Sequence, residues 1–216
     1  MPTPDYQPAE RRPIKSRDLK IAHRMANALI ARKVSANVIS VISVFFAAVA
    51  AAALVATARV EEPQARLGFV LAAVFIQLRL LANLLDGMVA VGSGRASAVG
   101  ELYNEVPDRI ADGLILVAAG FAAGSLPALG YVAALLAVFI AYLRALGGTV
   151  GARHLFVGPM SKSHRMAALT AACLYSAAMP MHRAMLVVLA VVILGAVVTS
   201  VRRLWRIAAQ LRENAS

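Results

Sequence analysis

Long runs of apolar residues dominate the sequence and predict membrane-spanning helices. Crossing a hydrocarbon core about 30 Å thick takes roughly 20 mostly apolar residues in a helix. Such runs occur at residues 38–58, 67–92, 113–143, 166–181 and 184–201. The third run is too long for one span, and Gly124-Ser125-Leu126-Pro127 divides it, because Gly and Pro together favour a turn. We therefore predict an all-α integral membrane protein with six transmembrane helices.

The segment before the first span, residues 15–33, has an amphipathic pattern. Ile21, Met25, Ala28 and Leu29 recur at helical spacing, and most of the basic side chains lie around the other side. An amphipathic helix lying on the membrane surface explains this pattern, and so does an ordinary basic tail that only sets the topology. We expect the interfacial helix.

Composition and charge support a membrane protein and argue against a nucleic-acid partner. Hydrophobic residues make up 60% of the 216 residues and charged residues 15%, whereas soluble domains average about 45–50% and about 25%. The net charge is +11, and most basic residues fall near the termini and in the loops after the second and fourth spans. This positive-inside pattern places both termini in the cytoplasm, next to anionic membrane lipids. We expect a cytoplasmic N-terminal segment at 1–37, a six-helix transmembrane domain at 38–205 and a cytoplasmic tail at 206–216.

Charged and amide side chains interrupt the apolar pattern around the second and third spans. Arg79, Asn83 and Asp86 lie at i, i+4 and i+7, on one face of the second helix. On the third helix, a second polar set falls within roughly a 100° arc: Glu101, Asn104, Glu105, Asp108 and Asp112. A short glycine-rich linker joins the two helices, so we expect both polar faces to line one cytoplasm-facing cavity. Charges at membrane depth cost about 2.5–3.5 kcal/mol each on insertion scales, which indicates a function.

The acids of this cluster predict a metal site for a diphosphate. Closely placed carboxylates repel one another unless a cation neutralises them. Hard divalent cations prefer oxygen ligands, and Mg²⁺ commonly bridges carboxylates and substrate phosphates. Two alternatives stay open: a solvated polar loop with ion pairs such as Arg109 with Glu105, and the acids of a small ion or metabolite transporter.

The same stretch resembles the motif of the CDP-alcohol phosphotransferase family, D-x2-D-G-x2-A-R-x8-G-x3-D-x3-D. Residues 83–108 read N-x2-D-G-x2-A-V-x8-G-x3-N-x3-D, with the spacing met at every position. Residues 35–40, S-A-N-V-I-S, are similar to the segment P-N-x-[IL]-[TS] that precedes the first span in the family. Six spans after an amphipathic helix also match, so the resemblance covers nearly the whole chain.

This resemblance implies a membrane enzyme of phospholipid biosynthesis. Members of the family move a phosphoalcohol group from a CDP-linked donor, often CDP-diacylglycerol, to an acceptor hydroxyl and release CMP. They are often homodimers. Carried over residue by residue, Asp86 and Asp108 would be ligands of Mg²⁺ or Mn²⁺, and Asp108 would also be the general base. Gly87, Ala90 and Gly100 would belong to the donor site, where a missing side chain lets the donor approach the backbone.

Three motif positions depart from the family. Asn83 and Asn104 replace two aspartates, and Val91 replaces the arginine. Asn supplies a carbonyl oxygen to a metal but no charge. We expect other side chains to compensate: Glu105, Glu101 and Asp112 as extra acids, Arg95 as the phosphate contact, and Arg79 as a cation that lowers the need for a second metal. The alternative is a catalytically degenerate relative that binds lipid or nucleotide as a partner.

Basic residues at the cytoplasmic ends of the fourth and fifth spans point to the acceptor. Arg144, Lys162 and Arg165 gather there, and residues 159–165 resemble the basic loop of family members that take phosphorylated acceptors. Arginine suits bidentate phosphate binding, which favours a product of the phosphatidylglycerophosphate or inositol-phosphate type. Positive-inside topology explains the same charges equally well. Composition and brevity favour a bacterial inner membrane, with the active site facing the cytoplasm.

Overall fold

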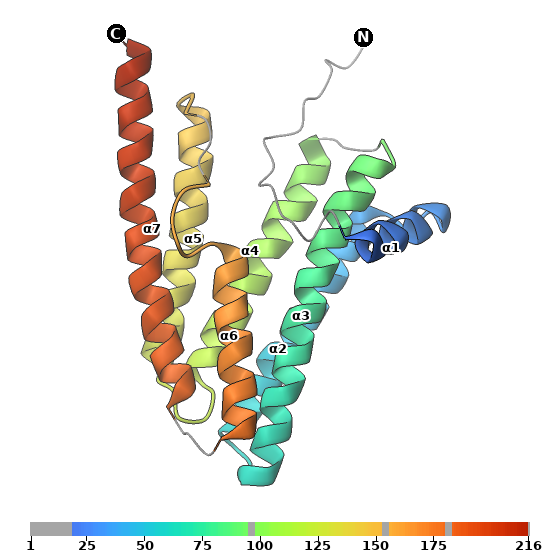
Figure 1. The fold of residues 1–216 in the computed structure, drawn as a ribbon, viewed down its shortest axis with the longest axis vertical. Helices are drawn as coiled ribbons and strands as arrows, with labels where there is room; N and C mark the ends of the chain where they lie inside the picture. Colours follow the sequence, from blue (N-terminus) through green and yellow to red (C-terminus); the bar gives the residue numbers. More distant parts are fainter. Residues whose placement is uncertain (1–18, 95–97, 153–155, 180–182, 216) are drawn as a thin grey trace. The chain divides into compact units, whose positions relative to one another are not determined.

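The computed structural model describes residues 19–94, 98–152, 156–179 and 183–215. All regular structure in these ranges is helical (Figure 1). The helices are α1 (Lys20–Ala31), α2 (Ala36–Thr57), α3 (Glu62–Gly92), α4 (Ala98–Gly120), α5 (Pro127–Thr149), α6 (Lys162–Ala178) and α7 (Ala184–Ala215). Of these, α2, α3, α5 and α7 are long and apolar enough to cross a membrane. The predicted all-α class is confirmed, and the apolar helices fit an integral membrane protein.

The helices form two compact units, and three of them contribute to both. Unit 1 comprises Met1–Phe46 and Leu78–Ala111, and unit 2 comprises Ala47–Gln77 and Asp112–Ser216. The unit boundaries therefore fall within α2, α3 and α4. All motif positions from 83 to 108 belong to unit 1, whereas the basic residues predicted to bind the acceptor belong to unit 2.

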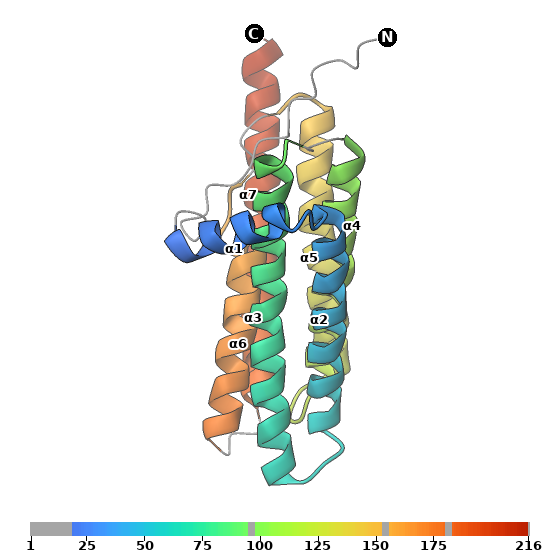
Figure 2. The same cartoon turned by 90° about the vertical axis from the view of Figure 1, so that its right-hand side faces the viewer.

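In unit 1, α1 lies crosswise to the neighbouring parts of α2 and α3 (Figure 2). Its buried residue Ala26 packs with Ile39 of α2 and with three residues of α3: Ala82, Leu85 and Val89. Ile21 and Met25 stay exposed on α1. A helix is therefore present within the predicted range 15–33, of which residues 15–18 lie outside the described part of the chain. Its residues Ala22 and Ala26 are buried, Leu29 and Ile30 pack partly buried against this cluster, and the membrane-surface location stays a prediction.

The end of α1 redirects the chain into α2. The Val34 N–H bonds to the Leu29 carbonyl and the Lys33 N–H to the Ile30 carbonyl. This hydrogen-bond pair is the Schellman arrangement, whose C′ residue takes a left-handed conformation. Lys33 occupies that position with φ 56°, although glycine is the usual residue there.

In unit 2, α7 packs against α5 and α6. The turn between α4 and α5 coincides with the predicted break: Gly124 has φ 71°, and α5 starts at Pro127. Proline suits the first helical position because its missing N–H would have no partner there. Just outside this turn, a Cβ on Gly120 would come within 2.9 Å of Gly130 Cα. The two helices can approach this closely only because both residues are glycine.

Candidate functional site

The first motif aspartate that the chain retains, Asp86 of α3, is buried in unit 1 with 1% of its surface exposed. The Ser40 hydroxyl of α2 donates a 2.7 Å hydrogen bond to Asp86 Oδ2. Ser40 ends the segment 35–40 that resembles the family's sequence before the first span. The adjoining Gly87 is also buried.

The second retained aspartate, Asp108 of α4, forms an ion pair with Arg79 of α3. Arg79 Nη2 lies 3.1 Å from Asp108 Oδ1 and also donates to the Asp108 backbone carbonyl at 3.3 Å. Arg79 is 0% exposed and Asp108 is 6% exposed. A second guanidinium, that of Arg109, lies 3.8 Å from the other carboxylate oxygen. Asp108 therefore faces two fixed positive charges.

The remaining motif residues of unit 1 are less buried than Asp86 and Asp108. Asn83, Ala90, Gly100 and Asn104 are half-buried. Glu105 pairs with Arg109 at 3.4 Å, with 42% and 24% of the respective side chains exposed. This is the ion pair that the polar-loop alternative anticipated. Arg95 and the side chain of Glu101 lie outside the described part of the chain.

Unit 2 contains a second buried Arg–Asp pair. Arg165 Nη2 of α6 lies 2.9 Å from Asp112 Oδ2 of α4, and each side chain is 2% exposed. Arg165 Nη1 also donates to the Met160 carbonyl at 3.1 Å. Asp112 was expected to add charge to the metal site, and Arg165 to contact the acceptor. In this structure the two side chains bind each other, while Arg144 and Lys162 are half-buried.

The segment before α6 is fixed by contacts that the sequence did not indicate. Thr199 of α7 accepts a hydrogen bond from the Met160 N–H at 2.9 Å. Arg203, also on α7, donates to the Val157 carbonyl at 3.2 Å and to the Ile140 carbonyl at 2.7 Å. Spacing along one helix cannot identify such partners, because they come from distant helices. The only indication in the sequence was the charge of Arg203 directly after the apolar run 184–201. The positive-inside pattern had explained such charges as setting the membrane topology.

The oxygen donors of unit 1 are of a kind that suits a hard cation. Asp86 and Asp108 are carboxylates, and Asn83 and Asn104 offer neutral amide oxygens. Among the described residues, no group of three or more His, Cys, Asp or Glu side chains is placed to hold a metal ion. Moreover, Asp108 is already neutralised by Arg79. Carboxylate and amide oxygens of this kind are ligands that Mg²⁺ and Mn²⁺ accept.

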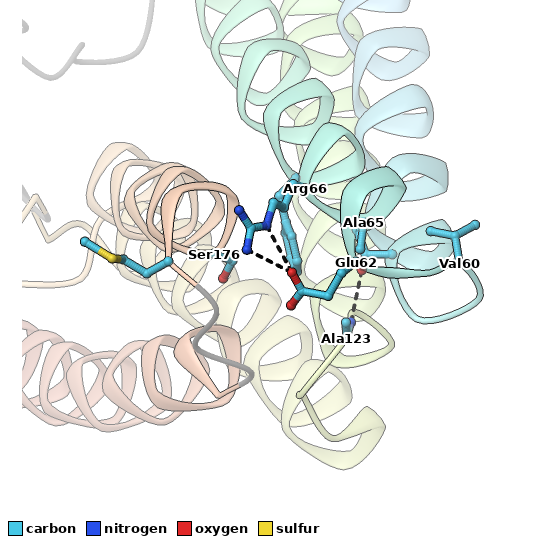
Figure 3. Close-up of a pocket in the computed structure, with 9 residues that line it drawn as sticks. Val60, Glu62, Ala65, Arg66, Ala123 and Ser176 are labelled. Atoms are coloured by element: carbon cyan, nitrogen blue, oxygen red, sulfur yellow. Dashed lines mark hydrogen bonds and ion pairs between the residues drawn. The ribbon is translucent and has the colours of Figure 1, made fainter.

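A small cavity elsewhere involves none of the predicted site residues (Figure 3). Its volume is about 180 Å³, and it lies in unit 2 beside the turn between α2 and α3. At its wall, Arg66 and Glu62 form an ion pair at 2.9 Å, and the Ala123 N–H bonds to Thr57 Oγ1. We do not assign the cavity to the reaction, because no motif residue lines it.

Solved structures of one enzyme share this fold. The chain matches Mycobacterium tuberculosis phosphatidylinositol phosphate synthase (PgsA1) with CDP-DAG bound at a TM-score of 0.69 and 18% identity, covering 88% of this chain and 94% of that one. The complex of that enzyme with manganese and citrate matches at 0.70 and 18%, covering 86% and 88%. Its apo form matches at 0.67 and 18%, covering 85% and 94%.

The chain has the fold of these synthases. The family resemblance predicted from the motif spacing is thereby confirmed at the level of the fold. No protein-family model and no curated protein sequence matches the chain. The roles of individual side chains therefore rest on the geometry of unit 1 and unit 2.

Proposed function

We propose that this chain is a membrane phosphatidyltransferase of phospholipid biosynthesis. It moves a phosphatidyl group from CDP-diacylglycerol to the hydroxyl of a small phosphorylated acceptor and releases CMP. The observation that carries this proposal is the burial of both retained motif aspartates in one unit, each with a defined polar partner. The shared fold supports it, because one neighbouring structure holds CDP-DAG.

The reaction is a displacement at phosphorus. The acceptor oxygen bonds to the β-phosphorus of the donor, the bond from that phosphorus to the bridging oxygen breaks, and CMP leaves with the electron pair. Asp108 accepts the proton of the acceptor hydroxyl. A positioned general base of this kind contributes typically about 10²–10⁴-fold. Arg79 holds the Asp108 carboxylate in place through its 3.1 Å contact.

We propose Mg²⁺ or Mn²⁺ as the cofactor; the neighbouring enzyme has a manganese complex. The oxygen atoms that would hold it are those of Asp86, Asp108, Asn83 and Asn104, with Glu105 as a further candidate. When bound, such an ion neutralises negative charge on the donor diphosphate and on the departing CMP.

The donor and acceptor contacts come from different parts of the sequence. For the donor, Gly87, Ala90 and Gly100 supply small residues in unit 1, and Arg95 supplies a phosphate contact. For the acceptor phosphate, Arg144 and Lys162 of unit 2 supply positive charge. We assign Arg165 a supporting role at the acceptor, because its guanidinium binds Asp112 and the Met160 carbonyl and so fixes the start of α6.

The membrane setting follows from the apolar helices and the charge distribution. We propose that α2 to α7 all span the membrane, with α1 on its surface, both termini and the active site facing the cytoplasm, and the chain a homodimer in a bacterial inner membrane. The donor's acyl chains stay in the bilayer, because each buried CH₂ contributes about 0.8 kcal/mol to membrane binding. The site must therefore open sideways toward lipid.

Purified protein in lipid nanodiscs provides the direct test. Radiolabelled CDP-diacylglycerol is supplied with Mg²⁺ or Mn²⁺ and one acceptor at a time: inositol phosphate, glycerol-3-phosphate, free inositol or serine. We expect CMP and a labelled phospholipid with a phosphorylated acceptor, and neither product without a metal. Absence of CMP release with every acceptor tested would contradict the transferase function.

A second candidate is a catalytically degenerate relative that binds the lipid or the nucleotide. Asn83 and Asn104 favour it, because they remove two charges from the donor set. The same nanodiscs distinguish the two functions. A degenerate relative would retain CDP-diacylglycerol in a binding assay and release no CMP from it.

A further inference from the structure

The last helix, α7, is longer than the hydrocarbon core of a membrane is thick (Figure 1). Its 32 residues correspond to about 48 Å of helix, whereas the core measures about 30 Å. The apolar run at residues 184–201 accounts for about 27 Å of this length. The part of α7 that begins with residue 202 therefore leaves the hydrocarbon.

The exposed face of α7 changes from apolar to basic at this point. Leu194 and Val201 are 68% and 42% exposed. Trp205 lies one turn after Val201 and is 74% exposed, and Arg202 and Arg206 beside it are also exposed. These five side chains fall within roughly a 140° arc of the helix. An apolar face of the kind that meets lipid tails thus continues into a tryptophan flanked by two arginines.

The opposite face of the same segment is packed within unit 2. Arg203 and Ile207 are both 7% exposed. Arg203 donates a 2.7 Å hydrogen bond to the Ile140 carbonyl of α5, and Ile207 packs with Ala152. These contacts fix the rotation of α7 about its own axis, so Trp205 and its two neighbouring arginines are directed away from the core of unit 2.

An indole and two guanidinium groups in this position complement an anionic phospholipid. Tryptophan is enriched at the interface between membrane and water, where its amphipathic ring lies at the level of the lipid headgroups. Basic residues at a membrane surface attract anionic lipids. A guanidinium can also donate two parallel hydrogen bonds to one phosphate group.

We propose that Arg202, Trp205 and Arg206 form a headgroup-binding surface, which holds an anionic phospholipid of the surrounding bilayer at the membrane boundary. The guanidinium groups contact the lipid phosphate, and the indole ring packs beside the adjoining glycerol and upper acyl chains. None of the three residues belongs to the motif at 83–108 or to the basic residues predicted to bind the acceptor. The inference therefore does not depend on the transferase function.

Tryptophan fluorescence tests this surface directly, because Trp205 is the single tryptophan of the chain. The full chain is reconstituted in vesicles of phosphatidylcholine and phosphatidylglycerol, and one of the two lipids at a time carries bromine atoms, which quench an indole on contact. At equal mole fractions we expect phosphatidylglycerol to be preferred about fivefold, the factor expected for one basic residue at an anionic surface. The preference should shrink at 1 M salt, where the Debye length is about 3 Å. Equal quenching by both lipids in the wild-type protein would overturn the proposal.

Variants then identify the arginines that cause the preference. Arg202→Gln combined with Arg206→Gln should reduce the preference to less than twofold, whereas lysine at both positions should retain it. The matched control is Arg59→Gln combined with Arg183→Gln, which removes two exposed arginines elsewhere in unit 2 and should leave the preference unchanged. An unchanged preference in the glutamine variant of Arg202 and Arg206 would overturn the proposal.

Other surroundings of Trp205 would give different signals. If water surrounded the ring, acrylamide in solution would quench it and neither brominated lipid would. If a second copy of the chain covered it, neither kind of quencher would act until the chains were diluted apart in excess lipid. Either result would overturn the headgroup-binding surface. CMP release is measured in the same vesicles, and its absence would contradict the transferase function while leaving the lipid preference intact.

Discussion

Two aspartates of α4, Asp108 and Asp112, each form a buried ion pair with an arginine of another helix, and the two pairs differ in their surroundings. In unit 1, Arg79 binds Asp108 at 3.1 Å, and 8% of the Asp108 side chain is exposed. In unit 2, Arg165 binds Asp112 at 2.9 Å, and both side chains are 2% exposed. Asp108 also lies 3.8 Å from the partly exposed Arg109, whereas Arg165 also holds the Met160 carbonyl.

Under the proposed function, this difference distinguishes a carboxylate that takes part in the reaction, Asp108, from one that stabilises the fold, Asp112. Removing one partner of a buried ion pair leaves an uncompensated charge and typically costs about 3–5 kcal/mol of stability. Breaking either pair should therefore cost this much stability. Only Asp108 keeps some accessible surface and occupies a motif position, so only its loss should also stop the reaction.

Asp108→Asn should have the largest effect. The amide cannot accept the acceptor's proton, and we expect CMP release to fall about 10²–10⁴-fold, the usual contribution of a general base. The amide oxygen can still accept a hydrogen bond from Arg79, but the broken ion pair should also lower the free energy of unfolding by about 3–5 kcal/mol, so rates are compared per folded protein. Initial rates of CMP release in nanodiscs, with size-exclusion profiles to confirm folding, provide the measurement. Activity within threefold of wild type would remove Asp108 from the mechanism.

Asp112→Asn should act on stability instead. The buried Arg165 guanidinium would lose the carboxylate that lies 2.9 Å away, which should lower the free energy of unfolding by about 3–5 kcal/mol. Thermal unfolding followed by tryptophan fluorescence measures the loss. The remaining folded protein should release CMP at a rate close to that of wild type.

The double variant Asp112→Leu with Arg165→Met serves as the control for that prediction. Apolar replacement of both partners of a buried pair is often neutral or stabilising, so we expect most of the stability to return. An Asp112→Asn protein as stable as wild type but as inactive as Asp108→Asn would reverse the assignment of the two pairs.

The sequence placed the residues of the first pair on adjacent polar faces but assigned Asp112 and Arg165 to two different sites. Helical spacing placed Arg79, Asp86 and Asp108 on polar faces of adjacent helices, and the structure buries all three in unit 1. The turn at residues 124–127 was predictable for a similar reason, because Gly and Pro act locally. Asp112 lies on the same arc of α4, and the sequence therefore grouped it with the metal ligands. Its partner, Arg165, is 53 positions away, and no local pattern reveals a contact across helices.

The ion pair between Arg165 and Asp112 changes which basic residue we expect to bind the acceptor phosphate. Because Arg165 binds Asp112, the contact with the acceptor phosphate is better tested at Lys162, the other predicted acceptor residue of α6, which is half-buried. Lys162→Gln should raise the KM for a phosphorylated acceptor about tenfold, equivalent to about 1.4 kcal/mol, with little change in kcat. Steady-state kinetics with a phosphorylated and an unphosphorylated acceptor test this. An equal change for both acceptors would contradict phosphate binding by Lys162.

The smallest effect concerns the neutral partner of the other motif carboxylate. Ser40→Ala removes the 2.7 Å hydrogen bond to Asp86 Oδ2 and should cost about 1 kcal/mol, the typical net value of one hydrogen bond. Because Asp86 keeps its charge, we expect only a few-fold rise in the Mn²⁺ concentration that gives half-maximal CMP release. Ser43→Ala is the matched control: Ser43 is equally buried, but its hydroxyl bonds only locally, to the Ser40 carbonyl. The Mn²⁺ dependence should change in the first variant and stay unchanged in the second. An unchanged dependence in both would mean that Asp86, like Asp112, serves the fold rather than the site.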